Sequence, residues 1–151
     1  ITVGGWLSIP LFAVPITLQT LFVILAAAFM KERAVLPVSL YVTAGLIGLP
    51  VFHNGAAGVG VLFGPTGGFI LGFIPAVLAA GFLFGKKMDV TAVISAILIT
   101  DICGMLWFMI TADASLPAAF VACVLPYIPG DIIKGAAAVA ASKRLSRILY
   151  D

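Results

Sequence analysis

The chain has 151 residues, of which 63% are hydrophobic and only 9% are charged, and its formal net charge is +2. Soluble domains average about 45 to 50% apolar and about 25% charged residues, so this composition indicates an integral membrane protein without a separate soluble domain. The small net charge, divided among short clusters, also argues against a nucleic-acid partner. At roughly 20 residues per spanning helix, residues 1–151 form one domain with room for five or six passes.

The first third of the chain predicts three helices. Residues 1–9 are apolar but too few to cross about 30 Å of hydrocarbon, so we interpret them as the end of a first helix whose beginning is missing from this sequence. A proline-bounded loop over 10–15 leads to a second helix over 16–30, which a charge cluster ends. A third helix is predicted over 34–49, and Pro50 stops it because proline lacks the N–H that the next helical turn needs.

Residues 51–68 form a glycine-rich stretch that is still hydrophobic, VFHNGAAGVGVLFGPTGG. This composition is too apolar for a solvated linker and too interrupted for a spanning helix. Irregular backbone at membrane depth is tolerated only where it is buried in protein or lines a polar cavity. We therefore predict a re-entrant or capping loop that covers a site.

The remainder predicts three more helices, which makes an all-α, polytopic protein with six transmembrane helices. The fourth helix is expected over 69–84, with a kink at Pro75, and the fifth over 90–110. The apolar run 116–125 is too short to span and should lie along the membrane interface. The sixth helix is expected to begin at residue 132, after a Pro-Gly turn.

The basic residues indicate how this protein is oriented in the membrane. If the helices alternate in direction, the loops after the second, fourth and sixth helices lie on one side. Seven of the eight basic residues fall there, namely Lys31, Arg33, Lys86, Lys87, Lys143, Arg144 and Arg147. The positive-inside rule makes that side cytoplasmic. We therefore predict a multi-pass protein of the plasma (inner) membrane with both termini in the cytoplasm and the glycine-rich loop outside.

Asp131 and Lys134 are the strongest candidate site residues. They are three residues apart at the start of the sixth helix and so share one face. An aspartate in a first turn is stabilised by the free N–H groups there, but a lysine inside an apolar helix needs a partner or a cavity. Two interpretations stay open: the pair contacts a ligand, or it is a purely structural ion pair.

Further candidates lie near the same predicted outer side. Asn54 and Gln19 carry amides that both donate and accept hydrogen bonds. Tyr41 is either a pocket wall or an interface anchor, and the glycines around Thr66 and Gly67 allow the backbone to approach a ligand closely. His53 is interpreted as an ordinary loop residue. The two cysteines lack metal-ligand spacing and are interpreted as packing residues, so we expect no metal and no cofactor.

Four motifs in order resemble the BioY family, the biotin-binding subunits of energy-coupling-factor (ECF) vitamin transporters. They are VPITLQT at 14–20, GLPVF at 48–52, LFGPTGGF at 62–69 and LPYIPGDIIK at 125–134. The resemblance covers nearly the whole chain. It implies a six-helix subunit, not an enzyme, which captures biotin from outside and works with a transmembrane coupling subunit and a pair of cytoplasmic ATPases in the lipid bilayer. The acid and the lysine that the family associates with biotin correspond to Asp131 and Lys134.

This chain departs from the family pattern at the shortened first helix and at Asp101, which lies near the middle of the fifth helix. Two alternatives remain. The chain could be the substrate-binding (S) component for another vitamin or small solute. More remotely, Asp101 and Asp131 could be the paired carboxylates of an intramembrane aspartyl protease.

Overall fold

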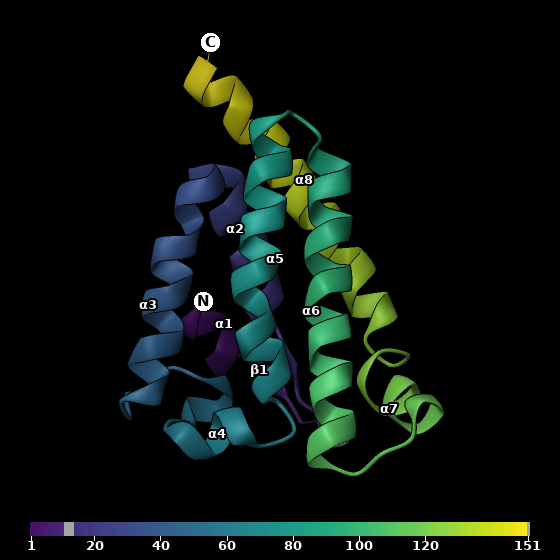
Figure 1. The fold of residues 1–151 in the computed structure, drawn as a ribbon. Helices are drawn as coiled ribbons and strands as arrows, with labels where there is room; N and C mark the ends of the chain where they lie inside the picture. Colours follow the sequence, from purple (N-terminus) through teal and green to yellow (C-terminus); the bar gives the residue numbers. More distant parts are fainter. Residues whose placement is uncertain (11–13, 151) are drawn as a thin grey trace.

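The computed structural model describes residues 1–10 and 14–150, with side chains described as far as residue 144. Residues 11–13 of the predicted proline-bounded loop and the side chain of Arg147 therefore lie outside the described part. The elements in chain order are α1 (Thr2–Trp6), β1 (Ser8–Ile9), β2 (Ile16–Thr17), α2 (Gln19–Met30), η1 (Lys31–Ala34), α3 (Val35–Leu46), η2 (His53–Gly55), α4 (Val59–Phe63), α5 (Gly67–Gly85), α6 (Asp89–Thr111), α7 (Leu116–Cys123) and α8 (Ile128–Tyr150). The predicted all-α class is confirmed (Figure 1).

Helices α5 and α6 form a tightly packed antiparallel hairpin because small residues line their contact. A Cβ added at Gly72 would lie 2.8 Å from the Cβ of Cys103, and one added at Gly68 would lie 2.6 Å from the carbonyl oxygen of Cys103. Neither position has room for a side chain, so the two backbones approach closely. This hairpin is the firmest pairing in the fold.

The main core lies between the hairpin and the pair α2 and α3. Its side chains are small or branched and almost completely buried, as expected for helices in close contact. They include Val23, Ile24 and Ala27 of α2, Val38 and Val42 of α3, and Ile70, Phe73, Ala76 and Val77 of α5. Phe52, which follows α3, is also fully buried in this core.

The outer surface of the helices is apolar, as a bilayer requires. Leu40 of α3, Leu98 of α6 and Ile133 of α8 are between 53% and 69% exposed. In the described part of the chain, α5 and α6 are each long and apolar enough to cross a membrane, and α7 with α8 would form a third crossing bent by 53°. Helices α2 and α3 have 12 residues each, about 18 Å, so the count of six crossings stays a prediction.

The basic clusters gather at one end of the molecule. The joint between α2 and α3, the turn between α5 and α6, and the end of α8 all lie at the top of Figure 1, and they carry Lys31, Arg33, Lys86, Lys87, Lys143 and Arg144. The short elements α4 and α7 lie at the opposite end. The predicted grouping of these clusters at one end is therefore confirmed.

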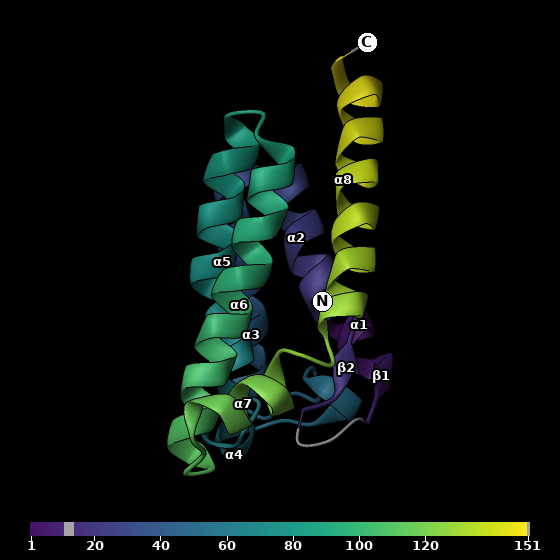
Figure 2. The same ribbon diagram turned by 90° about the vertical axis from the view of Figure 1, so that its right-hand side faces the viewer.

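A groove of about 750 Å³ separates α6 from α8, and Figure 2 shows α8 standing apart from the α5 and α6 hairpin. Aliphatic side chains such as Val93 and Ile97 of α6 and Val139 of α8 form most of its walls. Asp101 and Asp131 also line it. Helix α8 is thus much less tightly attached to α6 than α5 is.

Two predicted boundaries were wrong. Residues 16 and 17 form β2, not the start of a helix, and pair antiparallel with β1 in the register Ser8 to Thr17 and Ile9 to Ile16. β-Branched residues suit a strand, and the pairing satisfies backbone groups that a membrane would otherwise leave without partners. Helix α8 begins at Ile128, not at residue 132, because Pro129 is tolerated in a first turn.

Candidate ligand-binding site

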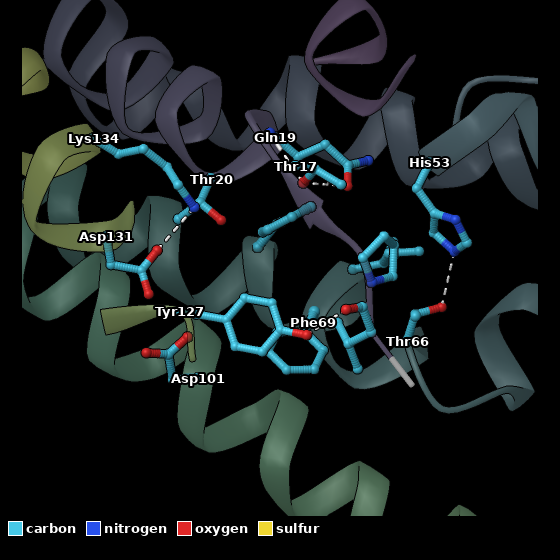
Figure 3. A pocket seen from close by; sticks show the side chains of 14 residues that line it. Thr17, Gln19, Thr20, His53, Thr66, Phe69, Asp101, Tyr127, Asp131 and Lys134 are labelled. Carbon is cyan, nitrogen blue, oxygen red and sulfur yellow. Dashed lines mark hydrogen bonds and ion pairs between the residues drawn. The ribbon is translucent and has the colours of Figure 1, made fainter. Parts of the chain in front are cut away.

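A cavity of about 50 Å³ lies between the starts of α2, α5 and α8, the middle of α6, and η2. Its ionisable residues Asp101, Asp131 and Lys134 lie at one end, and His53 and Thr66 lie at the other (Figure 3). Thr17 and Gln19 lie between the two ends, and the side walls include Phe69, Phe73 and Tyr127. The cavity thus has polar groups at both ends and both polar and aromatic residues between them, and a few polar groups among apolar walls are usual in small-molecule sites.

Asp131 and Lys134 form a buried ion pair on α8. The Asp131 N–H donates to the Tyr127 carbonyl at 2.9 Å, which places the acid in the first helical turn. Lys134 Nζ donates to Asp131 Oδ1, also at 2.9 Å, and the two residues are only 8% and 7% exposed. Burial of either charge alone would be costly, so each residue stabilises the other. Both also line the cavity, so the ion pair is shown, and contact with a ligand stays a prediction.

Asp101 reaches the same end of the cavity from α6. Its carboxylate is close enough to Asp131 and Lys134 for all three charges to interact. Tyr127, which precedes α8, lies beside the acids and donates its hydroxyl hydrogen to the Val14 carbonyl. Two acids and one base therefore share one end of the cavity.

Gln19 connects the middle of the cavity to the core. The Gln19 side chain is only 4% exposed. Its Nε2 donates a hydrogen bond to the Tyr41 hydroxyl, and its Oε1 accepts one from Thr17 Oγ1 at 3.1 Å. The Tyr41 ring packs edge-on against Phe52, with ring centroids 5.6 Å apart. Tyr41 is not part of the cavity wall, so it acts on the site by fixing Gln19.

His53 and Thr66 form the other end. His53 Nε2 lies 3.2 Å from Thr66 Oγ1. Among the described residues, His53 Nδ1 is a buried side-chain atom without a hydrogen-bond partner. Burial lowers the pKa of His53 below its usual value, so the imidazole is neutral at pH 7. A neutral imidazole has one donor and one acceptor nitrogen, which leaves one position for a ligand or a water molecule.

The seven predicted site residues divide into two groups. Asp131, Lys134, Gln19 and Thr66 line the cavity, whereas Asn54, Tyr41 and Gly67 support it from outside. Asn54 is exposed in the left-handed region, with φ of 54°, and accepts a hydrogen bond from Ser8 Oγ that ties the loop to β1. Direct ligand contact by any of the seven stays a prediction.

Gly67 is required for the fold of the loop. A Cβ at this position would collide with the Leu62 carbonyl group of α4. We expect Gly67→Ala to destabilise the protein by about 1 to 3 kcal/mol, as overpacking usually does, and to weaken ligand binding through displacement of Thr66. The measurement is thermal unfolding in detergent.

The matched control for Gly67→Ala is Gly85→Ala, at the other end of α5, where an added Cβ meets no atom within 4 Å. We expect this variant to be as stable as the wild type. Equal stability of the two variants would contradict the packing argument.

Sequence reasoning missed several residues of the cavity wall. His53 was interpreted as a loop residue and Asp101 was considered only as one acid of the protease alternative, yet both line the cavity. Phe69 and Phe73 could have been found, because residues four apart share a helix face. Tyr127, which lies in the same motif as Asp131, could be interpreted from the sequence either as a pocket wall or as an interface anchor, and it lines the cavity.

Comparison with known proteins supports one family. The family model described as "BioY family" matches residues 1–151. The "Probable biotin transporter BioY" of Pyrococcus horikoshii is 35% identical over 145 residues, which cover 95% of this chain and 88% of that protein. The "Biotin transporter BioY" of Rhodobacter capsulatus is 37% identical over 145 residues, which cover 84% of this chain and 76% of that protein. Among solved structures, the S-component for biotin from an ECF-type ABC transporter matches with a TM-score of 0.87 and 26% identity, over 97% of this chain and 84% of that one.

Proposed function

Because this chain belongs to the BioY family, we propose that it captures biotin at the cavity beside Asp131 and Lys134 and delivers it for uptake as an S component. The observation that carries the proposal is the end of the cavity where two acids and one lysine meet. All three residues are ionisable and line a small cavity, and Asp131 and Lys134 are buried; such groups usually mark a function in a membrane-embedded protein.

The ureido head of biotin complements this end of the cavity. The head has two N–H donors and one carbonyl acceptor. The carboxylates of Asp101 and Asp131 accept hydrogen bonds, and Lys134 Nζ donates them. A neutral head with this pattern adds no charge to a buried cluster, whereas the carboxylate of biotin would add a further negative charge beside two acids. We therefore place the ureido head at the acidic end.

The carboxylate of biotin then lies at the end formed by His53 and Thr66. The hydroxyl of Thr66 and the neutral imidazole of His53 offer hydrogen bonds without a negative charge. The aromatic residues Phe69, Phe73 and Tyr127 between the two ends suit the thioether ring and the aliphatic chain. This orientation uses the polar groups at both ends of the cavity.

The cavity must enlarge to admit biotin. Its volume of about 50 Å³ is well below the roughly 300 to 1,000 Å³ of ordinary small-molecule sites. The glycine-rich stretch 51–68 forms one side of the cavity, and we propose that this loop moves to let the ligand enter from outside. Phe52, which is fully buried, fixes the start of this loop in the core.

We place the basic end of the molecule in the cytoplasm, with several passes and both termini on that side, because lysine and arginine are enriched in cytoplasmic loops. The cavity then opens toward the outer side, where biotin arrives. For energised uptake we propose a transmembrane coupling subunit and a pair of cytoplasmic ATPases as partners, in a lipid bilayer. The named S-component structure comes from a transporter of the ECF type.

Two alternatives can now be weighed. BioY is a family of transporter subunits, so this chain is not an enzyme. In addition, Lys134 is bonded to Asp131, whereas a protease dyad needs two acids that share a proton. An S component for another vitamin would share the fold, and only its ligand would distinguish it.

The test is to purify the protein in detergent, identify the small molecule that co-purifies by mass spectrometry, and measure biotin binding by calorimetry. We expect biotin to be retained. Biocytin, in which the carboxylate is converted to an amide, should still compete, because the ureido head carries the recognition at the acidic end. Retention of a different vitamin, with no measurable biotin binding, would contradict the proposal.

A further inference from the structure

The groove between α6 and α8 opens on the lateral surface of the protein, and its walls are mainly aliphatic (Figure 2). Ile94 and Leu98 of α6 and Ile132 of α8 line it and are between 51% and 66% exposed. Cavities with aliphatic walls do not hold water, because water finds no hydrogen-bond partners there. In a bilayer the groove is therefore filled by hydrocarbon, which an acyl chain or an apolar helix could supply.

The length of the groove favours an acyl chain. Its wall on α6 runs from Val90 to Asp101, about 16 Å, and its wall on α8 runs from Ile128 to Lys143, about 22 Å. A helix that crosses the bilayer would need about 30 Å of wall, whereas one leaflet contributes about half of that depth. The groove starts at the basic end of the molecule, so it extends from one membrane surface to about the middle of the bilayer.

The basic end of the groove offers positive charge to a lipid head group. Lys143 lines the groove there, and no ion pair in the described part of the chain engages its ammonium group. Arg144 follows it, and the nearby turn between α5 and α6 carries two further lysines. Ser142 donates a hydrogen bond to the carboxylate of Asp89 at 2.8 Å, which joins α8 to α6 at this level. Basic side chains at a membrane surface attract anionic lipids.

We propose that this groove binds an anionic phospholipid from the leaflet on the basic side, which is the cytoplasmic leaflet in the orientation proposed above. One acyl chain lies along the groove between α6 and α8, and the phosphate group lies at Lys143. The chain ends near Asp101 and Asp131, the acids that the groove shares with the cavity. This lipid site does not depend on which small molecule the cavity binds.

The test compares two phospholipids that have the same acyl chains. Dioleoyl phosphatidylglycerol is anionic, whereas dioleoyl phosphatidylcholine has no net charge. Each is titrated into delipidated protein in detergent, and native mass spectrometry measures the lipid bound per protein. We expect phosphatidylglycerol to bind about tenfold more tightly, because several basic side chains lie at the mouth of the groove.

Lys143→Gln tests the head-group position. The preference for phosphatidylglycerol should fall by about fivefold, the effect of about one basic residue near an anionic lipid. Arg33→Gln is the matched control, because Arg33 lies at the same end of the molecule, in η1 between α2 and α3, but does not line the groove. This variant should keep the preference of the wild type.

Ala136→Phe tests the position of the acyl chain. Ala136 is an exposed residue of α8 that lines the groove, so an added ring would occupy the space of the chain. We expect both lipids to bind at least about tenfold more weakly. The matched control is Ala137→Phe, since Ala137 is also exposed but does not line the groove. If Ala136→Phe does not fold, Ala140→Phe takes its place, and if neither folds, Lys143→Gln decides.

Several outcomes would overturn the inference. These are equal affinity of the wild-type protein for the two lipids, an unchanged preference in Lys143→Gln, and an equal fall of the preference in Arg33→Gln. Unchanged lipid binding in folded Ala136→Phe would also overturn it, as would dimers that form in place of lipid-bound monomers, because a second copy would then cover the groove. Biotin binding is measured on the same preparation, and its absence would contradict the proposed function while the lipid site stands.

Discussion

Lys134→Met is expected to lower the affinity for biotin by at least about 100-fold and to destabilise the folded protein. Methionine keeps the unbranched shape of the side chain but removes the charge. The variant leaves Asp131 buried and unpaired, which typically costs about 3 to 5 kcal/mol. It also leaves the cavity with two acids and no donor for the ureido carbonyl. Calorimetry measures the affinity and thermal unfolding in detergent measures the stability.

A double-mutant cycle separates binding from stability. In Asp131→Asn with Lys134→Met, neither position is charged, so stability should recover relative to Lys134→Met alone. Biotin affinity should not recover, because the donor and one anionic acceptor are both lost. Recovery of binding along with stability would show that the pair serves only the fold. Unchanged affinity in both single variants would contradict the site itself.

Phe52→Ala is expected to cost about 3 to 5 kcal/mol of stability, the usual range for removal of a buried phenylalanine. The Phe52 ring is 0% exposed. It fills the space above Gly45, where an added Cβ would collide with the ring, and it meets Tyr41 edge-on. The variant should also reduce biotin affinity, because His53 follows Phe52 directly and Gln19 depends on Tyr41. Thermal unfolding and calorimetry on the same preparation check both effects.

Phe29→Ala is the matched control, with the same chemical change on the outer surface of α2. Phe29 is 52% exposed, so in a bilayer or in detergent its removal leaves no internal cavity. We expect a change of less than about 1 kcal/mol and no effect on affinity. Equal destabilisation by the two variants would show that burial of Phe52 does not anchor the loop.

Long apolar segments and charge clusters could be predicted from the sequence because they depend on local composition. Helices α5 and α6 agree with the predicted ranges to within two residues at each end. The position of Asp131 and Lys134 on one face follows from helical spacing alone. The start of α2 was predicted too early, because residues 16 and 17 belong to the same apolar run as the helix but pair with β1 instead.

The composition of the site depended on contacts that no local pattern contains. Asp101, His53 and Asp131 line one cavity only because α6, η2 and α8 converge around it. In the same way, the structural partner of Tyr41 is Gln19, which lies 22 residues away in the chain. The sequence identified residue types that suit a site, whereas the packing decides which of them line the cavity and which support it.

The groove between α6 and α8 places the two acids on separate helices, one on each wall. In the complex that we propose, a head group bound to both acids would link the tightly packed α5 and α6 hairpin to the more loosely attached α8. Helix α8 has 23 residues, about 35 Å, and the acids lie near its first turn. A small change in tilt at the bound head group moves the far end of this lever by a larger distance, at the end that carries Lys143 and Arg144. We therefore expect occupancy of the cavity to displace the opposite end of the molecule.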